Sequence, residues 1–237
     1  MELTIVIPTY NEKENIGILL ERIFKLSNKT KIIIVDDSPD QTIKEITNRY
    51  DDVYYIHRDE KAGRGSAVLK GIGYALANFN FNYIIEMDAD LSHDTNEIIN
   101  NVKFFLNEKA DLLISSRYLK NSKIVNWPIK RKILSFFANN LAKYILKVPV
   151  SDYTNGFRIY SNKAAKHVVT NCGKAGDGFI ILSEILVQLY YNNFKIKEIE
   201  STFVNRVRGD SSVTFKEIFN SLKGLVLIFK LKNKIKK

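Results

Sequence analysis

Two carboxylates follow an apolar segment at a spacing that suits a divalent metal ion on a diphosphate. Residues 83–87 read Tyr-Ile-Ile-Glu-Met, and Asp88 and Asp90 come directly after them, separated by Ala89. Carboxylate oxygens are ligands that Mg²⁺ and Mn²⁺ prefer, and a site with two of them leaves coordination positions for phosphate oxygens and water. An Asp-x-Asp pair is also typical of a solvated turn or a helix cap, so its meaning depends on the elements that position it.

Short β-branched segments alternate with longer amphipathic segments through the first half of the chain. This alternation predicts an α/β fold, with a mostly parallel sheet and helices on both of its faces. The expected strands are residues 3–7, 31–35, 53–56, 83–87 and 111–115. The expected helices are residues 14–26, 42–50, 66–78 and 96–107.

The loops that follow three of these strands carry acidic side chains. They are residues 8–12 after the first strand, residues 36–40 after the second and residues 88–90 after the fourth. Ligands of parallel sheets bind at the carboxyl ends of the strands, so we expect the three loops to form one ligand site. Taken alone, Tyr10 is also compatible with a packed surface aromatic, and Asp37 with a turn residue ahead of a proline.

Glycine-rich phosphate motifs do not account for this site. The chain has no Walker A sequence, and Gly63 and Gly65 lack the third glycine of a dinucleotide-binding loop and follow the third expected strand. We interpret these two glycines as a flexible turn that opens a helix. A backbone contact with a substrate is the alternative.

Length and composition indicate one domain, because the chain of 237 residues is 45% hydrophobic and has no repeat or low-complexity linker. A single cysteine excludes an intramolecular disulfide, and with three histidines we expect no zinc site. The N-terminal residues lack the basic flank of a signal peptide, and no apolar run approaches the roughly 20 residues that span a bilayer. These features predict a soluble or peripheral protein in a reducing, cytosol-facing compartment.

A formal net charge of +10 indicates an anionic partner, such as a nucleic acid, an anionic lipid or a phosphorylated substrate. The chain has no helix-turn-helix, zinc-finger or RNP motif, so we expect no nucleic acid. Residues 112–151 contain no acidic residue, and their basic residues are Arg117, Lys120, Lys123, Lys130, Arg131, Lys132, Lys143 and Lys147.

Residues 222–237 are also free of acidic residues and combine an apolar run, residues 225–229, with a lysine-rich end. An apolar patch beside lysines is typical of an interfacial membrane anchor. A last helix packed on the core, with a frayed basic tail, is the equally open alternative. We therefore expect a main domain in residues 1–221 and an amphipathic basic segment in residues 222–237 that contacts a membrane or another subunit.

Seven segments, taken in order, resemble the motifs of family 2 of the inverting glycosyltransferases, which have a GT-A fold. They are residues 6–15, 35–40, 87–93, 116–118, 127–132, 151–158 and 204–211. Within this family the chain resembles the dolichyl-phosphate mannose synthases, in their short form without transmembrane helices, over about residues 3–229. The resemblance implies that the main domain is a GT-A catalytic domain.

The reaction that this resemblance implies is transfer of mannose from GDP-mannose to the phosphate of dolichol or another polyprenol, with inversion and release of GDP. A divalent cation, Mg²⁺ or Mn²⁺, held by Asp88 and Asp90 would neutralise the charge that develops on the leaving diphosphate. A phosphate monoester is already mostly dianionic at neutral pH. The acceptor therefore needs cations to position it and no general base.

The resemblance also assigns residues to the two substrates. Around the guanosine would lie Pro8, Tyr10, Glu12, Val35 and Asp37, and around the diphosphate and metal Asp88, Ala89 and Asp90. Arg117, Arg131 and Ser135 would hold the acceptor phosphate. Arg206 would close over the donor diphosphate on a mobile loop, with Gly209 as a hinge candidate. The catalytic residues would be Asp90, Arg117, Arg131 and Arg206. The alternative for the three arginines is that they form part of a solvated basic surface.

Three positions depart from the family pattern. The loop of residues 36–40 is one residue shorter, Ser92 stands where some relatives have glutamine, and Ser212 replaces a lysine of the closing loop. They keep two alternatives open. One is a family 2 transferase that uses UDP-glucose or another donor, or a sugar hydroxyl acceptor with Asp152 as the base. The other is a non-catalytic nucleotide-binding subunit.

The resemblance finally implies where the protein acts and with what. A membrane surface and small membrane-anchoring subunits are the expected partners. The protein would be peripheral on the cytosolic face, at the endoplasmic reticulum in a eukaryote and at the plasma membrane in a prokaryote.

Overall fold

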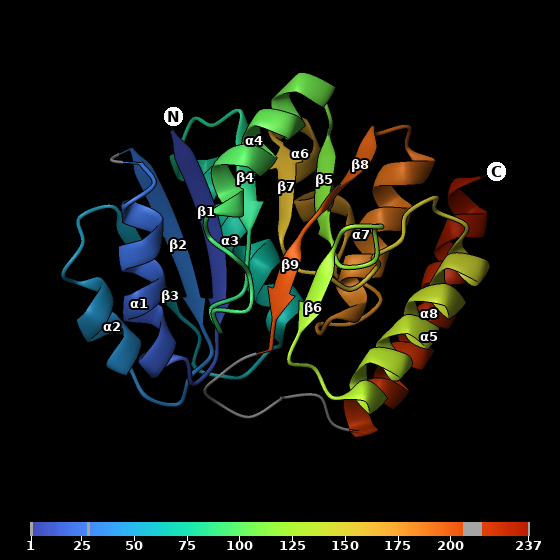
Figure 1. Cartoon of the computed structure of the whole chain (residues 1–237), viewed down its shortest axis with the longest axis horizontal. Coiled ribbons are helices and arrows are strands. Elements are labelled where there is room, and N and C mark those ends of the chain that lie inside the picture. Colours follow the sequence, from blue (N-terminus) through green and yellow to red (C-terminus); the bar gives the residue numbers. More distant parts are fainter. Residues whose placement is uncertain (1, 28, 206–214, 237) are drawn as a thin grey trace.

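The computed structural model describes residues 2–27, 29–205 and 215–236 (Figure 1). Within residues 215–222 it describes the backbone alone. Its strands are β1 (Leu3–Thr9), β2 (Thr30–Asp36), β3 (Val53–His57), β4 (Tyr83–Glu86), β5 (Leu112–Ser116), β6 (Lys123–Val125), β7 (Arg158–Ser161), β8 (Ile196–Glu200) and β9 (Thr202–Val204). Its helices are α1 (Lys13–Phe24), α2 (Thr42–Thr47), α3 (Arg64–Asn78), α4 (Glu97–Glu108), α5 (Ile129–Leu146), α6 (Asn162–Asn171), α7 (Ile180–Tyr191) and α8 (Phe215–Ile235).

A seven-stranded sheet with the order β3-β2-β1-β4-β7-β5-β8 forms the centre of the fold. β7 runs antiparallel to its neighbours β4 and β5, and the other neighbouring strands of this sheet are parallel. A short ribbon of β6 and β9 lies at the carboxyl edge of the sheet (Figure 1). The predicted α/β fold with a mostly parallel sheet is therefore confirmed.

Two hydrophobic layers cover the two faces of the sheet. Ile5 of β1 belongs to a cluster with Ile16 of α1 and Val102 of α4. The next residue, Val6, belongs to the opposite cluster, with Val68 of α3 and with residues of α6 and α7. Because successive strand side chains point to opposite faces, an apolar run such as β1 serves both layers. In Figure 1, α1 and α4 lie in front of the sheet and α3, α6 and α7 behind it, which confirms helices on both faces.

The strands and helices expected in the first half of the chain are all present, with small shifts at their ends. The elements that follow β5 were not predicted individually. Among them β7 returns between β4 and β5, so that the strand order does not follow the chain order. A local apolar pattern predicts that a strand forms but does not specify its direction or its neighbours.

α8 packs on the core and crosses position 222, where the sequence suggested a boundary. Leu225 and Ile228 are buried in the cluster that α7 shares. Lys232 Nζ donates to the main-chain oxygen of Ile145 in α5 at 2.7 Å, and the two helices lie side by side (Figure 1). The division into two parts stays a prediction. Within the described residues no helix has both the length and the apolar character needed to cross a membrane.

A fully buried arginine ties β7 to the start of α7. The guanidinium of Arg158 donates to the main-chain oxygens of Asn155 at 2.9 Å, Tyr153 at 3.1 Å and Leu182 at 2.9 Å. Each buried carbonyl that loses its donor costs about 1–3 kcal/mol. Arg158 therefore joins the segment that leads into β7 to the first turn of α7 through a single side chain.

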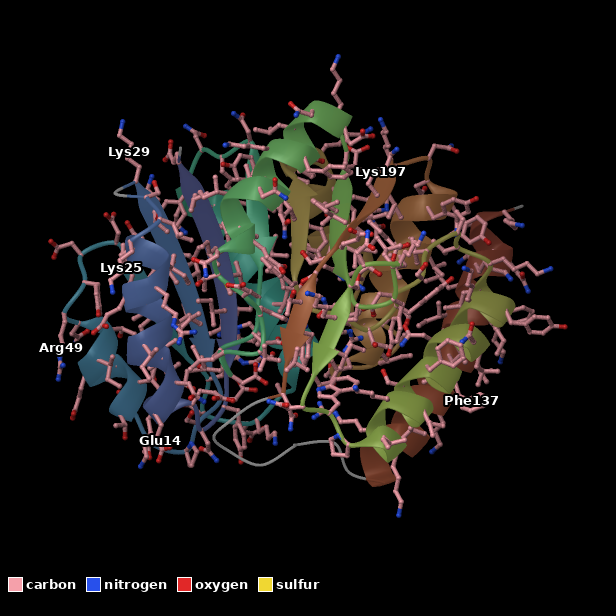
Figure 2. The ribbon with its side chains drawn as sticks, viewed as in Figure 1. Glu14, Lys25, Lys29, Arg49, Phe137 and Lys197 are labelled. Atoms are coloured by element: carbon pink, nitrogen blue, oxygen red, sulfur yellow. The ribbon has the colours of Figure 1, made fainter. Side chains whose placement is uncertain are left out.

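We expect Arg158→Met to lower the free energy of unfolding by about 3 kcal/mol, because methionine keeps part of the volume but donates no hydrogen bond. Arg49→Met is the matched control at an exposed position (Figure 2) and should change it by less than about 0.5 kcal/mol. Urea denaturation of both variants measures the difference. Equal stability would mean that the three hydrogen bonds contribute nothing net.

Candidate active site

The loops at the carboxyl ends of β1 and β2 are joined by hydrogen bonds. Thr9 Oγ1 donates to Asp36 Oδ1 at 2.8 Å, and the N–H of Asp37 donates to the main-chain oxygen of Thr9 at 3.0 Å. The N–H of Asn11 donates to Ser38 Oγ at 2.8 Å. β4 lies on the other side of β1, so the three acid-bearing loops share one edge of the sheet, as predicted.

The residues predicted to hold the guanosine lie along this edge with different exposure. Pro8 and Val35 are paired neighbours in β1 and β2, and both are buried. The side chain of Val35 packs in the core, so only its main chain can approach a ligand. Glu12 Oε2 accepts a hydrogen bond from a side chain in the first turn of α1 at 2.6 Å. Tyr10 is 38% exposed, with Lys61 Nζ 3.7 Å from its ring centre, and offers the most open surface of the set.

Asp37 is engaged by an arginine that the sequence did not single out. Arg58 Nε and Nη2 lie 2.5 and 2.6 Å from its two carboxylate oxygens, and the N–H of Ala62 donates to Oδ2 at 3.1 Å. Arg58 Nη1 donates to Ser66 Oγ in α3 at 2.7 Å. Asp37 therefore fixes the loop after β2 to the start of α3, in addition to any contact with a base.

The chain turns sharply after Asp90, and the turn orients its carboxylate. Leu91 has a left-handed backbone with a φ of 61°, which is uncommon for a residue with a Cβ. The turn brings the N–H and Oγ of Ser92 to Oδ1 of Asp90, at 3.1 and 2.5 Å. Strained backbone of this kind concentrates at functional sites. Ser92 thus acts here as a support for Asp90.

An unpredicted arginine lies between two acidic residues of β4 and its loop. Arg64, the first residue of α3, donates from Nη1 to Glu86 Oε1 at 2.6 Å and from Nε to Asp88 Oδ1 at 2.7 Å. The other oxygen of Glu86 accepts a hydrogen bond from the Tyr160 hydroxyl at 2.6 Å. Burial opposes the charge on Arg64, but the attraction of Asp88 and Glu86 outweighs it and raises the pKa of Arg64. Arg64 therefore neutralises Glu86 and sets the direction of Asp88.

Glycines make room for this arginine and for the start of its helix. A Cβ at Gly156 would lie 2.7 Å from Cζ of Arg64 and closer still to Nη2. Gly63 has a φ of 88°, and a Cβ there would lie 2.6 Å from the main-chain oxygen of Asp177. The expected helix start at this glycine pair is confirmed. Arg64, which stands between the two glycines, contacts the predicted metal ligand Asp88. The position of a basic residue after β3, at the same edge of the sheet, is the signal that could have pointed to it.

Asp88 and Asp90 suit a divalent metal only together with oxygens from a substrate. Both offer carboxylate oxygens, and the side chain of Asp88 is partly exposed. Across the part of the chain that the structure describes, no group of three or more acidic, histidine or cysteine side chains could hold a metal ion. Two carboxylates leave positions for diphosphate oxygens and water, so these residues fit a metal that is bound together with a nucleotide.

Arg117 is held by Asp152. Its Nε and Nη2 each lie 2.8 Å from one carboxylate oxygen, and its N–H donates to Oδ2 at 3.0 Å. Nη2 also donates to Thr154 Oγ1 at 2.6 Å. No described residue accepts a hydrogen bond from Nη1, so this donor remains available to a ligand. Burial alone would raise the pKa of Asp152, but the ion pair with Arg117 outweighs it and the pKa is lowered.

Trp127 brings the predicted acceptor residues together. The guanidinium carbons of Arg117 and Arg131 lie 5.5 and 4.2 Å from the centre of its ring, within the range of cation–π attraction. Ser135, one turn along α5 from Arg131, accepts a hydrogen bond from the Tyr118 hydroxyl at 2.7 Å. Trp127 is 7% exposed, and its indole N–H has no acceptor among the described residues. A phosphate oxygen beside the two arginines would satisfy this donor.

β9 connects the acceptor side to the turn after Asp90. The N–H of Val204 donates to the main-chain oxygen of Ser92 at 3.0 Å, and the N–H of Asn205 to that of Val125 at 2.9 Å. Asn205 Oδ1 accepts a hydrogen bond from Arg131 Nη1 at 3.0 Å. β9 and Asn205, the residue that follows it, therefore contact both predicted halves of the site.

Aromatic rings complete this connection. The Phe203 ring centre lies 5.5 Å from that of His93 and 5.3 Å from that of Trp127. His93 Nδ1 accepts a hydrogen bond from the N–H of Asp88 at 3.2 Å. The carboxylate turn and the arginine cluster thus form one connected site. Arg206, predicted to close over the donor, lies outside the described residues.

A parallel-sheet edge that joins a carboxylate pair to a cluster of arginines is the layout expected of a nucleotide-sugar transferase. The sequence profile described as glycosyl transferase family 2 matches residues 4–169, and the chain belongs to this family. The resemblance seen in the motifs is confirmed.

Two individual relatives align with most of this chain. The chain is 32% identical over 219 residues to the polyprenol monophosphomannose synthase of Mycolicibacterium smegmatis, a match that covers 90% of this chain and 82% of the relative. It is 33% identical over 243 aligned positions to the dolichol-phosphate mannosyltransferase of Pyrococcus furiosus, which covers 99% of this chain and 66% of that relative.

A solved structure confirms the fold. The glucosyl-3-phosphoglycerate synthase of Mycobacterium tuberculosis, in complex with Mn²⁺, UDP and phosphoglyceric acid, superposes with a TM-score of 0.66. The match covers 98% of this chain and 78% of the other at 16% identity. At this identity the likeness establishes the GT-A fold alone.

We expect Gly156→Ala to lower the transfer rate by about tenfold to a hundredfold, because the added methyl group displaces Arg64 from Asp88. Gly178→Ala is the matched control, since a Cβ there meets no atom within 4 Å. Initial rates and Mn²⁺ titrations of both variants provide the measurement. Unchanged activity in Gly156→Ala would mean that the position of Arg64 does not matter.

We expect Trp127→Phe to raise the KM for the acceptor by about tenfold, because phenylalanine keeps a ring for the two arginines but loses the N–H donor to a charged oxygen. The KM for the donor serves as the internal control and should not change. Steady-state kinetics with each substrate varied in turn provide the measurement. An equal change in the KM values of both substrates would contradict the prediction.

Proposed function

We propose that the protein transfers mannose from GDP-mannose to the phosphate of dolichol or another polyprenol, with inversion at the sugar carbon and release of GDP. Two relatives that align with most of this chain are named for mannosyl transfer to polyprenyl phosphates, which supports the sugar and the acceptor. Tyr10, Glu12 and Asp37 at the ends of β1 and β2 are the proposed contacts of the guanosine.

The observation that carries the proposal is the ion pair of Asp152 with Arg117. Both oxygens of Asp152 accept hydrogen bonds from Arg117, and the lowered pKa of Asp152 makes it a weak base. A sugar hydroxyl acceptor needs a base to remove its proton, whereas a phosphate monoester is mostly dianionic at neutral pH. The geometry therefore favours a phosphate acceptor over a hydroxyl acceptor with Asp152 as its base.

The acceptor phosphate would lie between Arg117 and Arg131, with Ser135 as a further contact. Arg117 is buried and fixed by Asp152, and Trp127 packs against both guanidinium groups. Burial of Arg117 strengthens the attraction between phosphate and guanidinium and would keep one oxygen directed at the sugar.

The donor diphosphate would be held at the turn of Asp88, Ala89 and Asp90 together with Mg²⁺ or Mn²⁺, which stabilises the charge on the departing GDP. The synthase of the same fold from Mycobacterium tuberculosis is solved with Mn²⁺ and UDP, which supports a divalent cation. Arg64 orients Asp88 and Ser92 orients Asp90 for this task. Arg206 is the proposed further contact of the diphosphate.

The acceptor also bears on where the protein acts. Because a polyprenyl phosphate is a membrane lipid, we place the protein at the cytosolic face of a membrane as a peripheral protein. This is the endoplasmic reticulum in a eukaryote and the plasma membrane in a prokaryote. Small membrane-anchoring subunits are the further proposed partners.

Purified protein, radiolabelled GDP-mannose, Mg²⁺ or Mn²⁺ and a short-chain polyprenyl phosphate should yield label in the lipid phase, and EDTA should abolish it. We expect Asp90→Asn to lower the rate by about a hundredfold or more, because it removes a charge that holds the cation on the leaving group. Asp51→Asn, at an exposed position, is the matched control and should keep full activity.

Other outcomes would contradict the proposal in distinct ways. Labelling by UDP-glucose and not by GDP-mannose would replace the donor. Transfer to a sugar hydroxyl that is lost in Asp152→Asn would replace the acceptor. Failure to bind GDP at millimolar concentration with Mn²⁺ would reject transfer and favour a non-catalytic subunit.

A further inference from the structure

Arg64 places a positive charge directly at one of the two carboxylates proposed for the metal ion. Its Nε and Nη2 lie 2.7 and 2.6 Å from Asp88 Oδ1. A carboxylate that accepts charge-assisted hydrogen bonds has less charge to offer to a second cation, and the guanidinium also repels that cation. Arg64 and a divalent metal ion therefore compete for Asp88.

Contacts on its other sides keep Arg64 at this position. Its Nη1 donates to Glu86 Oε1 at 2.6 Å, and the side chain of Glu86 is only 1% exposed. The ring centre of Phe179 lies 5.3 Å from the guanidinium carbon. Moving the arginine away would break the pair with Glu86 and leave a buried carboxylate without its cation, which is strongly unfavourable. We therefore expect Arg64 to stay beside Asp88 when ligands bind.

His93 also lies near Asp88 but brings no charge to it. Its Nε2 is 3.8 Å from Asp88 Oδ2. Because the N–H of Asp88 donates to Nδ1 at 3.2 Å, this nitrogen carries no proton and the ring is neutral. The proton on Nε2 has Asn155 Oδ1 as an acceptor at 3.1 Å. Of these two basic side chains, Arg64 is the one that is charged beside Asp88.

The same charge has the opposite effect on a diphosphate. Asp88 and Asp90 are both acidic, so without a neighbouring cation they repel the phosphate groups of a nucleotide. Arg64 offsets one of these charges in the free protein, while Glu86 is too deeply buried to meet a ligand. A nucleotide can thus approach the carboxylate pair before any metal ion is bound. Its phosphate oxygens then offset the repulsion between Arg64 and the metal ion.

We propose that Arg64 sets the order in which these ligands bind. Its charge at Asp88 disfavours a divalent cation in the free protein and favours the nucleotide diphosphate, so the nucleotide binds first and the metal ion second. The inference rests on the proposed function, because it takes Asp88 and Asp90 as the place where diphosphate and metal meet. Arg64 itself lies outside the motifs on which that function was first inferred.

Binding measurements on a double variant test the proposal. Arg64→Met with Glu86→Gln removes the guanidinium together with the buried carboxylate that it neutralises, so the formal net charge does not change. Without nucleotide, the double variant should bind Mn²⁺ about tenfold more tightly than the wild type, because the competing cation at Asp88 is gone. The free-ion signal in electron paramagnetic resonance measures this affinity. In EDTA, GDP should bind the double variant about tenfold more weakly, as measured by titration calorimetry.

Glu86→Gln alone is the matched control, because it keeps Arg64 at Asp88. It should bind Mn²⁺ no more tightly than the wild type does, and thermal unfolding shows whether each protein is folded. The opposite signs of the two changes expected in the double variant identify an effect of charge. A double variant that binds both Mn²⁺ and GDP more weakly would assign Arg64 a structural role and overturn the proposal. An unchanged affinity for either ligand would overturn it too.

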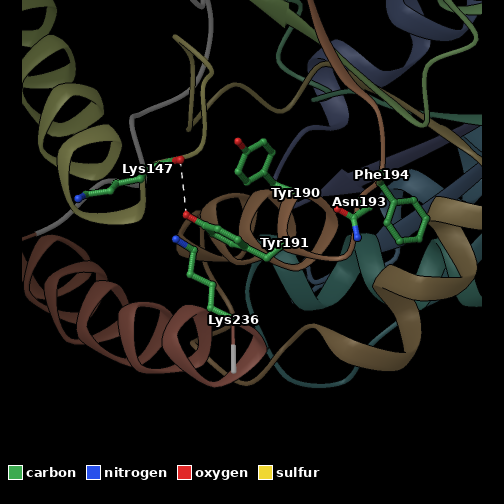
Figure 3. A pocket seen from close by; sticks show the side chains of 6 residues that line it. All are labelled: Lys147, Tyr190, Tyr191, Asn193, Phe194 and Lys236. Carbon is green, nitrogen blue, oxygen red and sulfur yellow. Dashed lines mark hydrogen bonds between the residues drawn. The ribbon is translucent and has the colours of Figure 1, made fainter.

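A control at a second basic region detects binding of GDP elsewhere. Lys147 and Lys236 border a hollow of about 510 Å³ together with Tyr190 and Tyr191, near the ends of α5, α7 and α8 (Figure 3). None of these residues belongs to the loops that carry the carboxylates. Lys147→Gln with Lys236→Gln should therefore leave the affinity for GDP at the wild-type value. A GDP affinity that this pair lowers and the Arg64 pair does not would contradict the proposal.

The proposal and the proposed function fail in different ways. The Mn²⁺ measurement needs neither nucleotide nor turnover. A protein that transfers mannose, but whose wild type and double variant bind Mn²⁺ equally, would retain the function and reject the role of Arg64. A protein that shows the expected affinities for Mn²⁺ and GDP, but transfers no mannose to a polyprenyl phosphate, would reject the function and retain the role of Arg64.

Discussion

Pairing of buried carboxylates with arginines from neighbouring elements is the constraint on which the site depends. A parallel sheet gathers acidic loops at one edge, where unpaired carboxylates would repel one another and lose hydration. Here three arginines, two from the segment that joins β3 to α3 and one after β5, meet these carboxylates and fix their direction. The pairs are Arg58 with Asp37, Arg64 with Glu86 and Asp88, and Arg117 with Asp152.

What could be predicted from the sequence is what short-range patterns encode. The first strands and helices follow from runs of β-branched residues and from apolar positions three and four apart. Asp88 and Asp90 could be singled out as candidate metal ligands because they stand directly after such a run. Arg117 and Arg131 were assigned through motif resemblance, and the structure brings both to Trp127.

The rest depends on contacts between residues far apart in the chain. Arg64 meets Asp88 24 positions away and the main chain of Gly156 92 positions away, and no local pattern pairs them. Arg58 was missed for the same reason. The direction of β7 depends on how the chain returns to the sheet after α5, so its placement between β4 and β5 could not be predicted. Asp152 looked like a possible base because its partner was unknown.

The position of the arginine cluster at the beginning of α5 has a consequence for how the reaction would respond to its lipid. On a membrane-bound protein of this geometry, the acceptor would be captured by its headgroup while its tail stays in the bilayer. Encounter then takes place in two dimensions. The rate would follow the mole fraction of acceptor in the leaflet rather than its total amount, and added inert lipid would slow the reaction by dilution in the plane alone.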